Sequence, residues 1–435
     1  MSAPRHRVVW APPEGCLAAA HGRSETVPSG PLPVLDVAAL VRLAESASLR
    51  GRGGAGFPVA RKVRAVAAKR RRPVVVVNAA EGEPASGKDA ALLRHAPDLV
   101  LDGAELLARA LGTRDVRIWA PGHDLGAAES MTSAVAERRH LRGHRGAPVV
   151  QVTVAPDHFV AGESTAAARG LSGRTAVPRA DGRRTSETGV DGRPTLVLNI
   201  ETVAQLARLA RGLPATRLVT VLGAVAAPGV VELPAEAPLS AALTAAGGLS
   251  EPTRAFVLGG YHGEWWAAQD VHGLRLGDPD GPLADCSIVV ALPDDACLLA
   301  EVQNVSRYLA AESAGQCGPC VFGLPLLAEA VGRLARGVAG VAEVEAQREL
   351  LTGRGACYHP DGSVGFVTSA LAVLAAEVAE HRAGHGACGR PRRAVLPIPG
   401  ASGGRRTTAG FVDADGGSVP TTPVPRTVTV LSVRS

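Results

Sequence analysis

Aromatic residues and lysine are the scarce components of this chain. Phe, Trp and Tyr make up only 3% of its 435 residues while 46% are hydrophobic, so the core must be packed mainly from Ala, Val and Leu. Lys62, Lys69 and Lys88 are the only lysines, so arginine supplies almost all of the positive charge. The net charge of +5 is too small for this length to indicate a nucleic-acid partner. Two or more domains are expected, because a chain of this size exceeds the usual single core.

A long hydrophobic run is also absent. No uninterrupted apolar stretch reaches the roughly 18 residues that are needed to cross a bilayer. The N-terminus, with Pro4, Arg5 and Arg7, lacks the apolar core of a signal peptide. We therefore expect no membrane insertion and a cytoplasmic location. Seven cysteines in a chain of this length do not make a disulfide scaffold, so a close pair of them indicates metal or redox chemistry.

The pattern along the chain changes at four places. Residues 1–34 carry Pro and Gly without periodicity and are expected to form a loose arm. Residues 35–212 alternate between helix and strand patterns, which predicts an α/β domain. Residues 216–270 are expected to form a small β-grasp-like module. Apolar residues recur every three to four positions in residues 290–388, which predicts a helical domain, and residues 389–435 have the composition of a disordered tail.

Individual elements can be placed within these domains. The expected strands are 74–78, 116–120, 149–155 and 255–259, and the expected helices are 98–111, 239–246, 298–311, 324–335, 342–351 and 367–382. The fold class that follows is α/β, with a helical domain at the end of the chain.

The cysteines of the helical domain are grouped. Cys317-Gly318-Pro319-Cys320 places two thiols three positions apart, which can bind one metal centre, and the downstream Cys357 can close over it. A thioredoxin-like motif is disfavoured, because a helix rather than a strand leads into the pair. We expect Cys317, Cys320 and Cys357 to be metal ligands and interpret Cys16, Cys286 and Cys297 as buried or incidental residues.

A glycine loop is the first candidate for ligand binding. Gly51-Arg52-Gly53-Gly54-Ala55-Gly56 matches the dinucleotide fingerprint in letters, but a helical pattern rather than a strand precedes it, which argues against a Rossmann turn. The loop runs into a helix, whose free N–H groups can bind a phosphate. Lys62, about one turn further on, can add a positive charge. The alternative is a glycine-rich turn without a ligand.

Polar residues follow several of the expected strands. Asn78, Glu81 and Glu83 come directly after a buried strand, where ligand-contacting groups of open α/β sheets collect. Gly162-Glu163 and the segment from Asn199 to Thr202 repeat this design. Such groups suit contacts to the hydroxyls and ring nitrogens of a cofactor. An acidic surface turn, or an asparagine that only caps a helix, is the alternative.

Taken together, these segments resemble in order and spacing the flavoprotein subunit of respiratory NADH:quinone oxidoreductase (complex I) and its relatives in hydrogenases and formate dehydrogenases. The resemblance spans roughly residues 35–382 and implies FMN on the α/β domain, NADH stacked beside it and a 4Fe-4S cluster on the helical domain. It implies catalytic roles for Glu83 and Glu163, which would face the electron donor. The cofactor-binding residues that it implies are Gly51, Gly53, Gly54, Ala55, Gly56, Lys62, Asn78, Glu81, Glu83, Gly162, Glu163, Asn199 and Thr202.

The chain departs from the family at cofactor positions. Ala314 stands where the family has the first of four cluster cysteines, which leaves His359, Cys388, a partner protein or solvent as the fourth ligand, or a three-iron cluster. Ala80 stands where the family has an aspartate that contacts FMN. Arg184 takes the place of an aromatic residue that lines the NADH pocket, which argues against unchanged NADH specificity, although arginine can stack on a base.

These observations predict a soluble electron-transfer oxidoreductase subunit. It would pass electrons between a nicotinamide-type donor, FMN and an iron–sulfur cluster, with a ferredoxin or another redox-complex subunit as its partner. Whether it is itself an NADH dehydrogenase-like enzyme the sequence does not decide. Two alternatives stay open: a diverged, non-catalytic binding or assembly protein that keeps the fold without redox cofactors, and an interaction module stabilised by zinc at the three cysteines.

Overall fold

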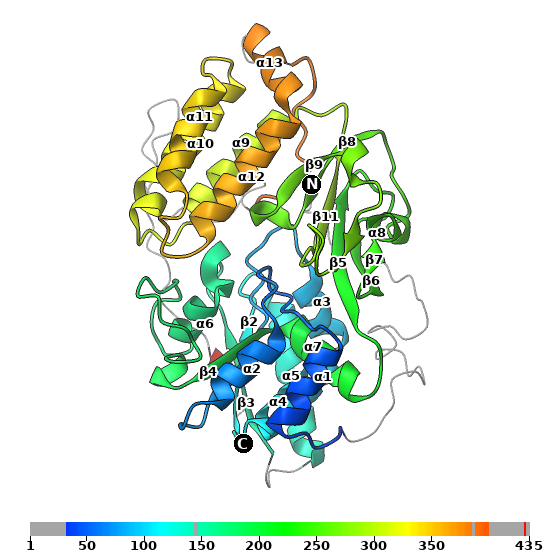
Figure 1. Ribbon diagram of the computed structural model, residues 1–435, viewed down its shortest axis with the longest axis vertical. Helices are drawn as coiled ribbons and strands as arrows, with labels where there is room; N and C mark the ends of the chain where they lie inside the picture. Colours follow the sequence, from blue (N-terminus) through cyan, green and yellow to red (C-terminus); the bar gives the residue numbers. More distant parts are fainter. Residues whose placement is uncertain (1–31, 143–146, 385–387, 400–429, 432–435) are drawn as a thin grey trace.

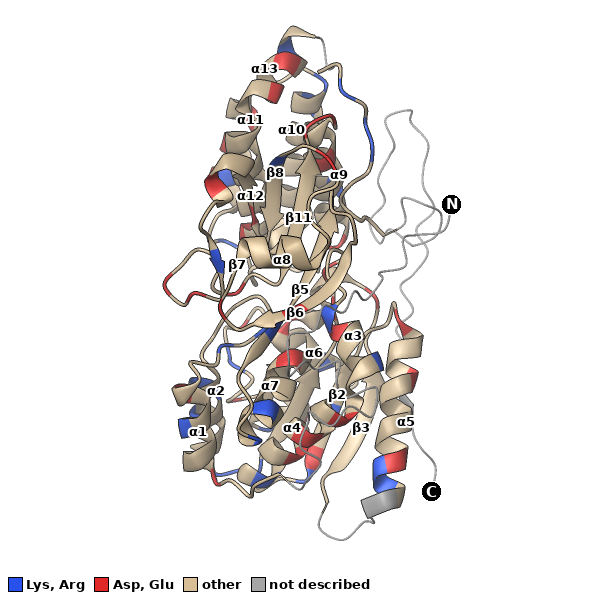
Figure 2. Ribbon diagram, turned by 90° about the vertical axis from the view of Figure 1, so that its right-hand side faces the viewer, with Lys and Arg blue, Asp and Glu red and all other residues tan. Residues whose placement is uncertain are grey.

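The structure is a computed structural model that describes residues 32–142, 147–384, 388–399 and 430–431. Three parts follow one another along the chain (Figure 1): an α/β part at the bottom of the view, a second sheet at the upper right and a helical bundle at the upper left. The predicted fold class, an α/β domain with a small module and a helical domain, is confirmed. Basic and acidic positions are interspersed along the described ribbon (Figure 2).

Four parallel strands form the body of the first sheet, in the order β3-β2-β1-β4, and β12 pairs antiparallel with β3 at one edge. The strands are β1 (Val74–Asn78), β2 (Asp115–Ala120), β3 (Val149–Val154), β4 (Thr195–Asn199) and β12 (Val430–Leu431). β1 lies in the middle and buries a run of four valines completely. Parallel sheets are covered on both faces, which is why this strand is apolar throughout rather than alternating.

The two faces of this sheet belong to different cores. Val75 and Val77 pack against helices α1 to α5 and α7, whereas Val74 and Val76 pack on the other face with Trp119 and residues of α6. This division follows from the twofold alternation of side chains along a strand. The helices are α1 (Val37–Ser46), α2 (Val59–Ala67), α3 (Lys88–His95), α4 (Pro97–Ala110), α5 (Leu125–Arg142), α6 (Ser164–Gly170) and α7 (Ile200–Ala210).

The second sheet has the order β6-β5-β11-β8-β9 and is antiparallel except for the pair β5 and β11. Its strands are β5 (Thr216–Gly223), β6 (Gly229–Pro234), β8 (Thr253–Leu258), β9 (Glu264–Ala267) and β11 (Ile288–Pro293), with α8 (Leu239–Ala245) and the short pair β7 (Ala237–Pro238) and β10 (Arg275–Leu276) beside them. The central strand β11 lies beyond residue 270, where the sequence pattern placed the end of the module. Long-range pairing, which local patterns do not reveal, brings it into the sheet.

The bundle contains α9 (Leu298–Ala311), α10 (Leu324–Ala335), α11 (Val341–Leu351), α12 (His359–Val373) and α13 (Ala375–Ala383). The single helix expected over 367–382 is therefore two helices. α12 begins at His359 with Pro360 in its first turn, where a proline is tolerated. Among the described residues no single helix has the length and apolarity to span a membrane. Only α12 and α13 together reach that length, and they are bent by 75°.

The segment 388–399 runs along α9. The backbone N–H groups of Val395 and Leu396 donate to the Glu301 carboxylate at 3.1 and 2.7 Å, and the Leu396 side chain is buried. The expectation of a disordered tail from residue 389 is therefore wrong for 389–399, because a single buried carboxylate and one apolar side chain fix the segment despite its composition. The rest of the expected tail, apart from β12, and residues 1–31 of the expected arm lie outside the described residues.

Candidate functional site

The glycine loop packs on the start of α7. The Arg52 N–H donates to the hydroxyl of Thr202 at 2.9 Å, and a Cβ added at Gly53 would lie 3.5 Å from that of Asn199. Gly54 adopts φ +90°, a conformation that favours glycine, and a Cβ there would meet no atom within 4 Å. Thr202 is completely buried and thus supports the loop from behind. The open side of the loop lies at Gly54.

Several buried polar atoms around this loop have no hydrogen-bond partner among the described residues: Arg50 Nε, Arg52 Nε, Glu201 Oε2 and Asp285 Oδ1. The nearest opposite charges are in ionic range only, with Arg50 Nε 3.6 Å from Asp285 and Arg52 Nε 4.0 Å from Glu201. Unpaired buried polar groups are costly, so a polar ligand or water belongs beside them. This set suits a phosphate-bearing cofactor, and it was missed from the sequence although the two arginines flank and enter the loop.

Lys62 extends from α2 towards the sheet, where its Nζ donates to the Val197 carbonyl at 3.3 Å. Burial lowers the pKa of this lysine, and the negative charge of Glu163 partly offsets the change. One hydrogen bond uses one of the three protons of the ammonium group. The remaining donors make Lys62 suitable for an anionic group at the loop.

Polar residues from three motifs meet at the carboxyl ends of β1 and β4. Asn78 and Asn199 are opposite each other in the register of these strands. Asn199 caps α7 through its Oδ1, accepts from Lys88 Nζ at 3.2 Å with the same atom and donates to Asp89 at 2.6 Å. Glu81 accepts the N–H of Asp89. The sheet therefore brings Asn78, Glu81 and Asn199 together, as the strand-end argument requires.

Lys88 is the charged centre of this network and is 4% exposed. Its ammonium pairs with Asp89 and lies 3.5 Å from Glu201. Burial alone would lower the pKa of Lys88, but the carboxylates of Asp89, Glu201 and Glu81 raise it above its ordinary value. The lysine is therefore charged and held in place. We expect it to fix the wall of the site rather than to move a proton.

Two glycines allow a close backbone approach between the β1 end and the turn at 159–162. A Cβ at Gly82 would lie 2.0 Å from the Phe159 carbonyl oxygen, and one at Gly162 would lie 2.4 Å from the Ala80 carbonyl oxygen. Asn78 Nδ2 donates to the Gly162 carbonyl at 2.6 Å. Gly162 is thus required by packing, and the two segments form one edge of the site.

The two candidate catalytic carboxylates contact backbone N–H groups. Glu163 caps α6 by accepting from Thr165 and Ala166 at 2.8 and 3.0 Å. Glu83 accepts from Ala85 at 3.1 Å and from Tyr261, in the second sheet part, at 2.7 Å. Burial raises the pKa of Glu83 to about 7, although these two N–H groups oppose the rise. Their catalytic role stays a prediction, and Glu83 also joins two parts of the fold.

Glu83→Gln is expected to change how stability depends on pH. In the folded protein Glu83 keeps its proton up to about pH 7, whereas in the unfolded chain it loses it at about pH 4.3. Between these values the folded state binds more protons, so this carboxyl contributes less to stability as the pH rises. Glutamine does not titrate. The free energy of unfolding of the variant minus that of the wild type, measured with urea, should therefore increase from about pH 4.3 to about pH 7; a constant difference would contradict the assignment.

The three candidate ligand cysteines are gathered at one end of the bundle. Cys317 and Cys320 lie at the short π-helix Pro319–Gly323, and Cys357 directly precedes α12. Cys320 is buried, which raises its pKa to about 12 together with the thiols of Cys317 and Cys357, while the Ala314 N–H opposes the rise. Three thiols that disfavour one another's ionisation suit a bound cation, because a metal centre stabilises all three thiolates. The residues present therefore fit a cluster or metal with three protein ligands.

Neither proposed protein substitute for the fourth ligand lies free beside these thiols. Both ring nitrogens of His359 are engaged, Nε2 with the Leu309 carbonyl at 2.8 Å and Nδ1 with His262 at 3.0 Å. Cys388 lies 3.9 Å from Glu377 on α13, beyond the far end of α12. A helix of 15 residues is about 22 Å long. The hypotheses that His359 or Cys388 completes the centre are therefore not supported by this arrangement.

The thiols border the α/β part. Gln316 Nε2 donates to the Pro178 carbonyl at 2.7 Å, and the charge of Glu163 contributes to the raised pKa of Cys357 as well as acting on Lys62. Exposed apolar side chains surround the thiols on the outside, namely Val321, Phe322, Leu326 and Tyr358, with Phe322 69% exposed. The centre is thus close both to the glycine-loop region and to the surface.

Three family models match successive parts of the chain. The Nuo51 FMN-binding domain matches residues 44–208, the SLBB domain residues 218–260, and the NADH-ubiquinone oxidoreductase-F iron-sulfur binding region residues 300–398. The chain belongs to the family of the flavoprotein subunit of NADH:quinone oxidoreductase. It is a divergent member with an FMN-binding domain and an iron–sulfur region, which identifies it as an electron-transfer subunit.

Known members of this family align over most of the chain. The second of the F-type subunits of NADH-quinone oxidoreductase from Rhizobium meliloti is 28% identical over 79% of this chain and 88% of that protein. The corresponding NADH-quinone oxidoreductase protein of Escherichia coli K12 is 27% identical over 76% of this chain and 82% of its own length. The crystal structure of an NAD+-reducing NiFe hydrogenase in its H2-reduced state superimposes with a TM-score of 0.77 at 25% identity, over 87% of this chain and 68% of that chain.

Proposed function

We propose that this family member passes electrons from a nicotinamide-type donor through FMN to an iron–sulfur cluster and on to a ferredoxin or another subunit of a redox complex. The observation that carries the proposal is the position of Glu163. Its charge acts on the pKa of Lys62, beside the glycine loop, and on that of Cys357, in the thiol group. A flavin at the loop and a cluster at the thiols would therefore be neighbours.

The loop at 51–56 and Lys62 would bind the FMN phosphate, because backbone N–H groups and one lysine are what an anion requires. Bound FMN supplies a centre that accepts two electrons and releases them singly. Asn78, Glu81 and Asn199 would line the remainder of the cofactor site, and Lys88 holds them in position through its contacts with Asn199 and Asp89. Glu83 and Glu163 would face the donor.

The donor site is where this chain differs most from its relatives. In the segment 178–185 Arg179 turns back onto Asp181 and the Thr188 carbonyl, while Arg184 is exposed. Phe159 is enclosed by His262, Tyr308 and His359, with ring centroids 4.7 to 6.2 Å away. Arg184 is therefore the group that we propose to stack on a nicotinamide-type donor.

The cluster would bind to the thiolates of Cys317, Cys320 and Cys357. The Ala314 N–H donates to the Cys320 thiol, so the side-chain position of residue 314 adjoins the group. Ala314→Cys is thus expected to supply the missing ligand and to raise the iron content by about one atom per chain. Iron analysis and the rate of bleaching in air measure this. Gly315→Cys, one position along, is the matched control, and equal iron in all three proteins would contradict the ligand assignment.

We propose that the acceptor binds over the exposed apolar residues beside the thiols, because electrons must leave where the cluster is nearest to the surface. Phe322→Asp is expected to slow electron transfer to a ferredoxin at least about tenfold, since a charge there opposes burial of the contact. Flavin and iron contents should not change. Leu125→Asp, on α5 and 58% exposed, is the control. Equal rates in the two variants would show that the acceptor binds elsewhere.

A further inference from the structure

A second group of metal-binding side chains lies at the end of the bundle remote from the three cysteines. Cys297, Glu377, His381 and Cys388 place one ligand atom each within 4.8 Å of one another. The first three are each 1% exposed and Cys388 is half-buried. The 15-residue α12 separates this group from Cys357. It is therefore a different site from the proposed cluster, although the sequence offered Cys388 only as a cluster ligand and Cys297 as an incidental residue.

Three separate elements supply these residues. Glu377 and His381 are four positions apart on α13 and so share one face of the helix. Cys297 is the residue that precedes α9, and Cys388 lies in the segment that follows α13. The Cys297 N–H donates to the Pro391 carbonyl at 2.9 Å, which holds that segment beside the start of α9. The chain thus closes around the group on itself.

The distances fit a tetrahedral ion. Bonds of about 2.3 Å to sulfur and about 2.0 to 2.2 Å to nitrogen and oxygen place the ligand atoms of zinc about 3.3 to 3.8 Å apart. Cys297 Sγ lies 3.4 Å from His381 Nε2, and Glu377 Oε1 lies 3.8 Å from that nitrogen and 3.9 Å from Cys388 Sγ. Shifts of a few tenths of an ångström would bring all of them to bonding distance.

The surrounding contacts orient the ligand atoms. His381 Nδ1 donates to the Ala335 carbonyl at 2.7 Å, which leaves the lone pair of Nε2 facing the other three groups. Arg254 pairs with one oxygen of Glu377, and the Leu299 N–H donates to the other at 2.8 Å. Histidine ligands of metals ordinarily have such a hydrogen-bonded second nitrogen.

The charges also balance around a divalent cation. Two thiolates and one carboxylate carry three negative charges, and a doubly charged ion together with Arg254 neutralises them. Without the ion, the two thiols and the histidine would have only one another as partners in a buried place. Soft sulfur ligands combined with one nitrogen and one oxygen select zinc over magnesium or calcium.

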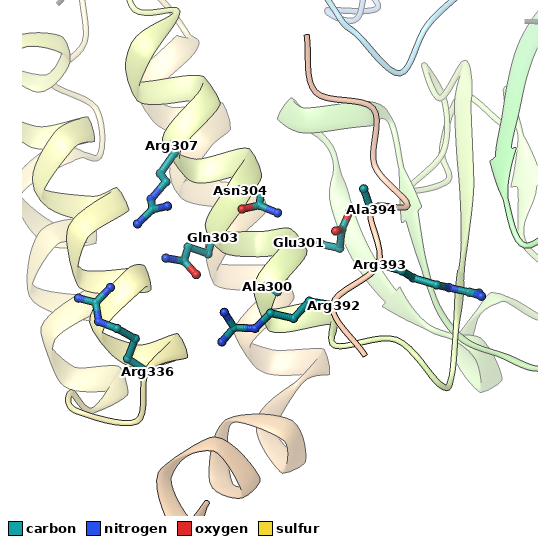
Figure 3. Close-up of a pocket in the computed structure, with 9 residues that line it drawn as sticks. All are labelled: Ala300, Glu301, Gln303, Asn304, Arg307, Arg336, Arg392, Arg393 and Ala394. Carbon is teal, nitrogen blue, oxygen red and sulfur yellow. The ribbon is translucent and has the colours of Figure 1, made fainter. Parts of the chain in front are cut away.

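We propose that Cys297, Glu377, His381 and Cys388 bind a structural Zn2+ that ties α13 and the segment 388–399 to the start of α9. Four protein ligands leave no position for a substrate, so the role is to hold the fold. The segment that the ion would fix also forms one wall of a cavity of about 400 Å³ against α9. Arg307, Arg336 and Arg392 line this cavity, while Arg393 points away from it (Figure 3) and pairs with Glu251.

Metal analysis of variants of the full-length protein tests this site. The anaerobically purified wild type should contain about one zinc per chain, and Cys388→Ser and His381→Gln should lower the zinc content about tenfold without changing the iron content. Cys320→Ser should do the reverse. Zinc that follows Cys320 rather than Cys388 would overturn the proposal, as would a Cys297–Cys388 disulfide in that protein. The iron content reports on the proposed function separately.

A second measurement applies if those variants do not fold. Treatment of the wild type with a zinc chelator should lower the Tm by about 5 °C, because the ion binds only the folded state. Addition of Zn2+ should restore the Tm and addition of Mg2+ should not. A Tm that does not respond to chelation or to Zn2+, in a protein whose thiols are all reduced, would overturn the proposal.

Discussion

Cys320→Ser should remove iron from the protein while flavin stays bound. Cys320 is the most buried of the three thiols, contacts Cys317 and receives the Ala314 N–H. With only three cysteines at the centre, the loss of one leaves two thiolates, which do not hold a cluster of this kind. We expect the iron content to fall at least about tenfold. The glycine loop and Lys62 are in another part of the fold and should keep their ligand.

Iron and flavin analysis of the same purified sample measures both effects. Cys388→Ser is the matched control, because it removes a thiol from the same domain at a site remote from the centre. It should keep wild-type iron. If Cys320→Ser retains iron at the wild-type ratio, the assignment of Cys317, Cys320 and Cys357 as cluster ligands is wrong.

Lys62→Gln should weaken FMN binding by about 10- to 100-fold, which corresponds to about 1.4 to 2.7 kcal/mol. Hydrogen bonds between a charged group and a phosphate are worth about this much. The ammonium has a single hydrogen bond, to Val197, and lies one turn into the helix that follows the glycine loop. Its removal should leave the fold unchanged, because glutamine can donate to the same carbonyl.

The quenching of FMN fluorescence on addition of apoprotein measures the dissociation constant. Lys69→Gln is the control for loss of one positive charge, since Lys69 is exposed beyond the end of α2. The two variants should differ by at least about tenfold in affinity. Equal dissociation constants would place the phosphate elsewhere than at the glycine loop.

Local patterns predicted the elements of the two ends of the chain well. The strand expected at 74–78 and the helices expected at 298–311 and 324–335 have those bounds in β1, α9 and α10. A run of buried valines and a repeat of apolar residues every three to four positions are strong signals. The break between α12 and α13 was missed, because apolar residues continue across it and no proline or glycine marks it.

Long-range contacts set the limit for the site. That Glu83 binds Tyr261, 178 residues away, has no local signature. Likewise, Cys297 and His381 are 84 positions apart, so spacing alone left Cys297 without a partner. The strand-end rule did place Asn78 and Asn199 together, because strand order in a parallel sheet follows from general topology. The family resemblance supplied the grouping of Cys357 with the other two thiols.

The central claim is that this chain carries both a flavin and an iron–sulfur cluster on Cys317, Cys320 and Cys357. Anaerobic purification, a visible spectrum, and flavin and iron contents per chain test it most directly. We expect flavin bands above a broad iron–sulfur absorption, about one FMN per chain and about three to four irons per chain, with both chromophores bleached on reduction. A colourless, iron-free protein that cannot be reconstituted with FMN, iron and sulfide would contradict the account and favour a binding or assembly role for this fold.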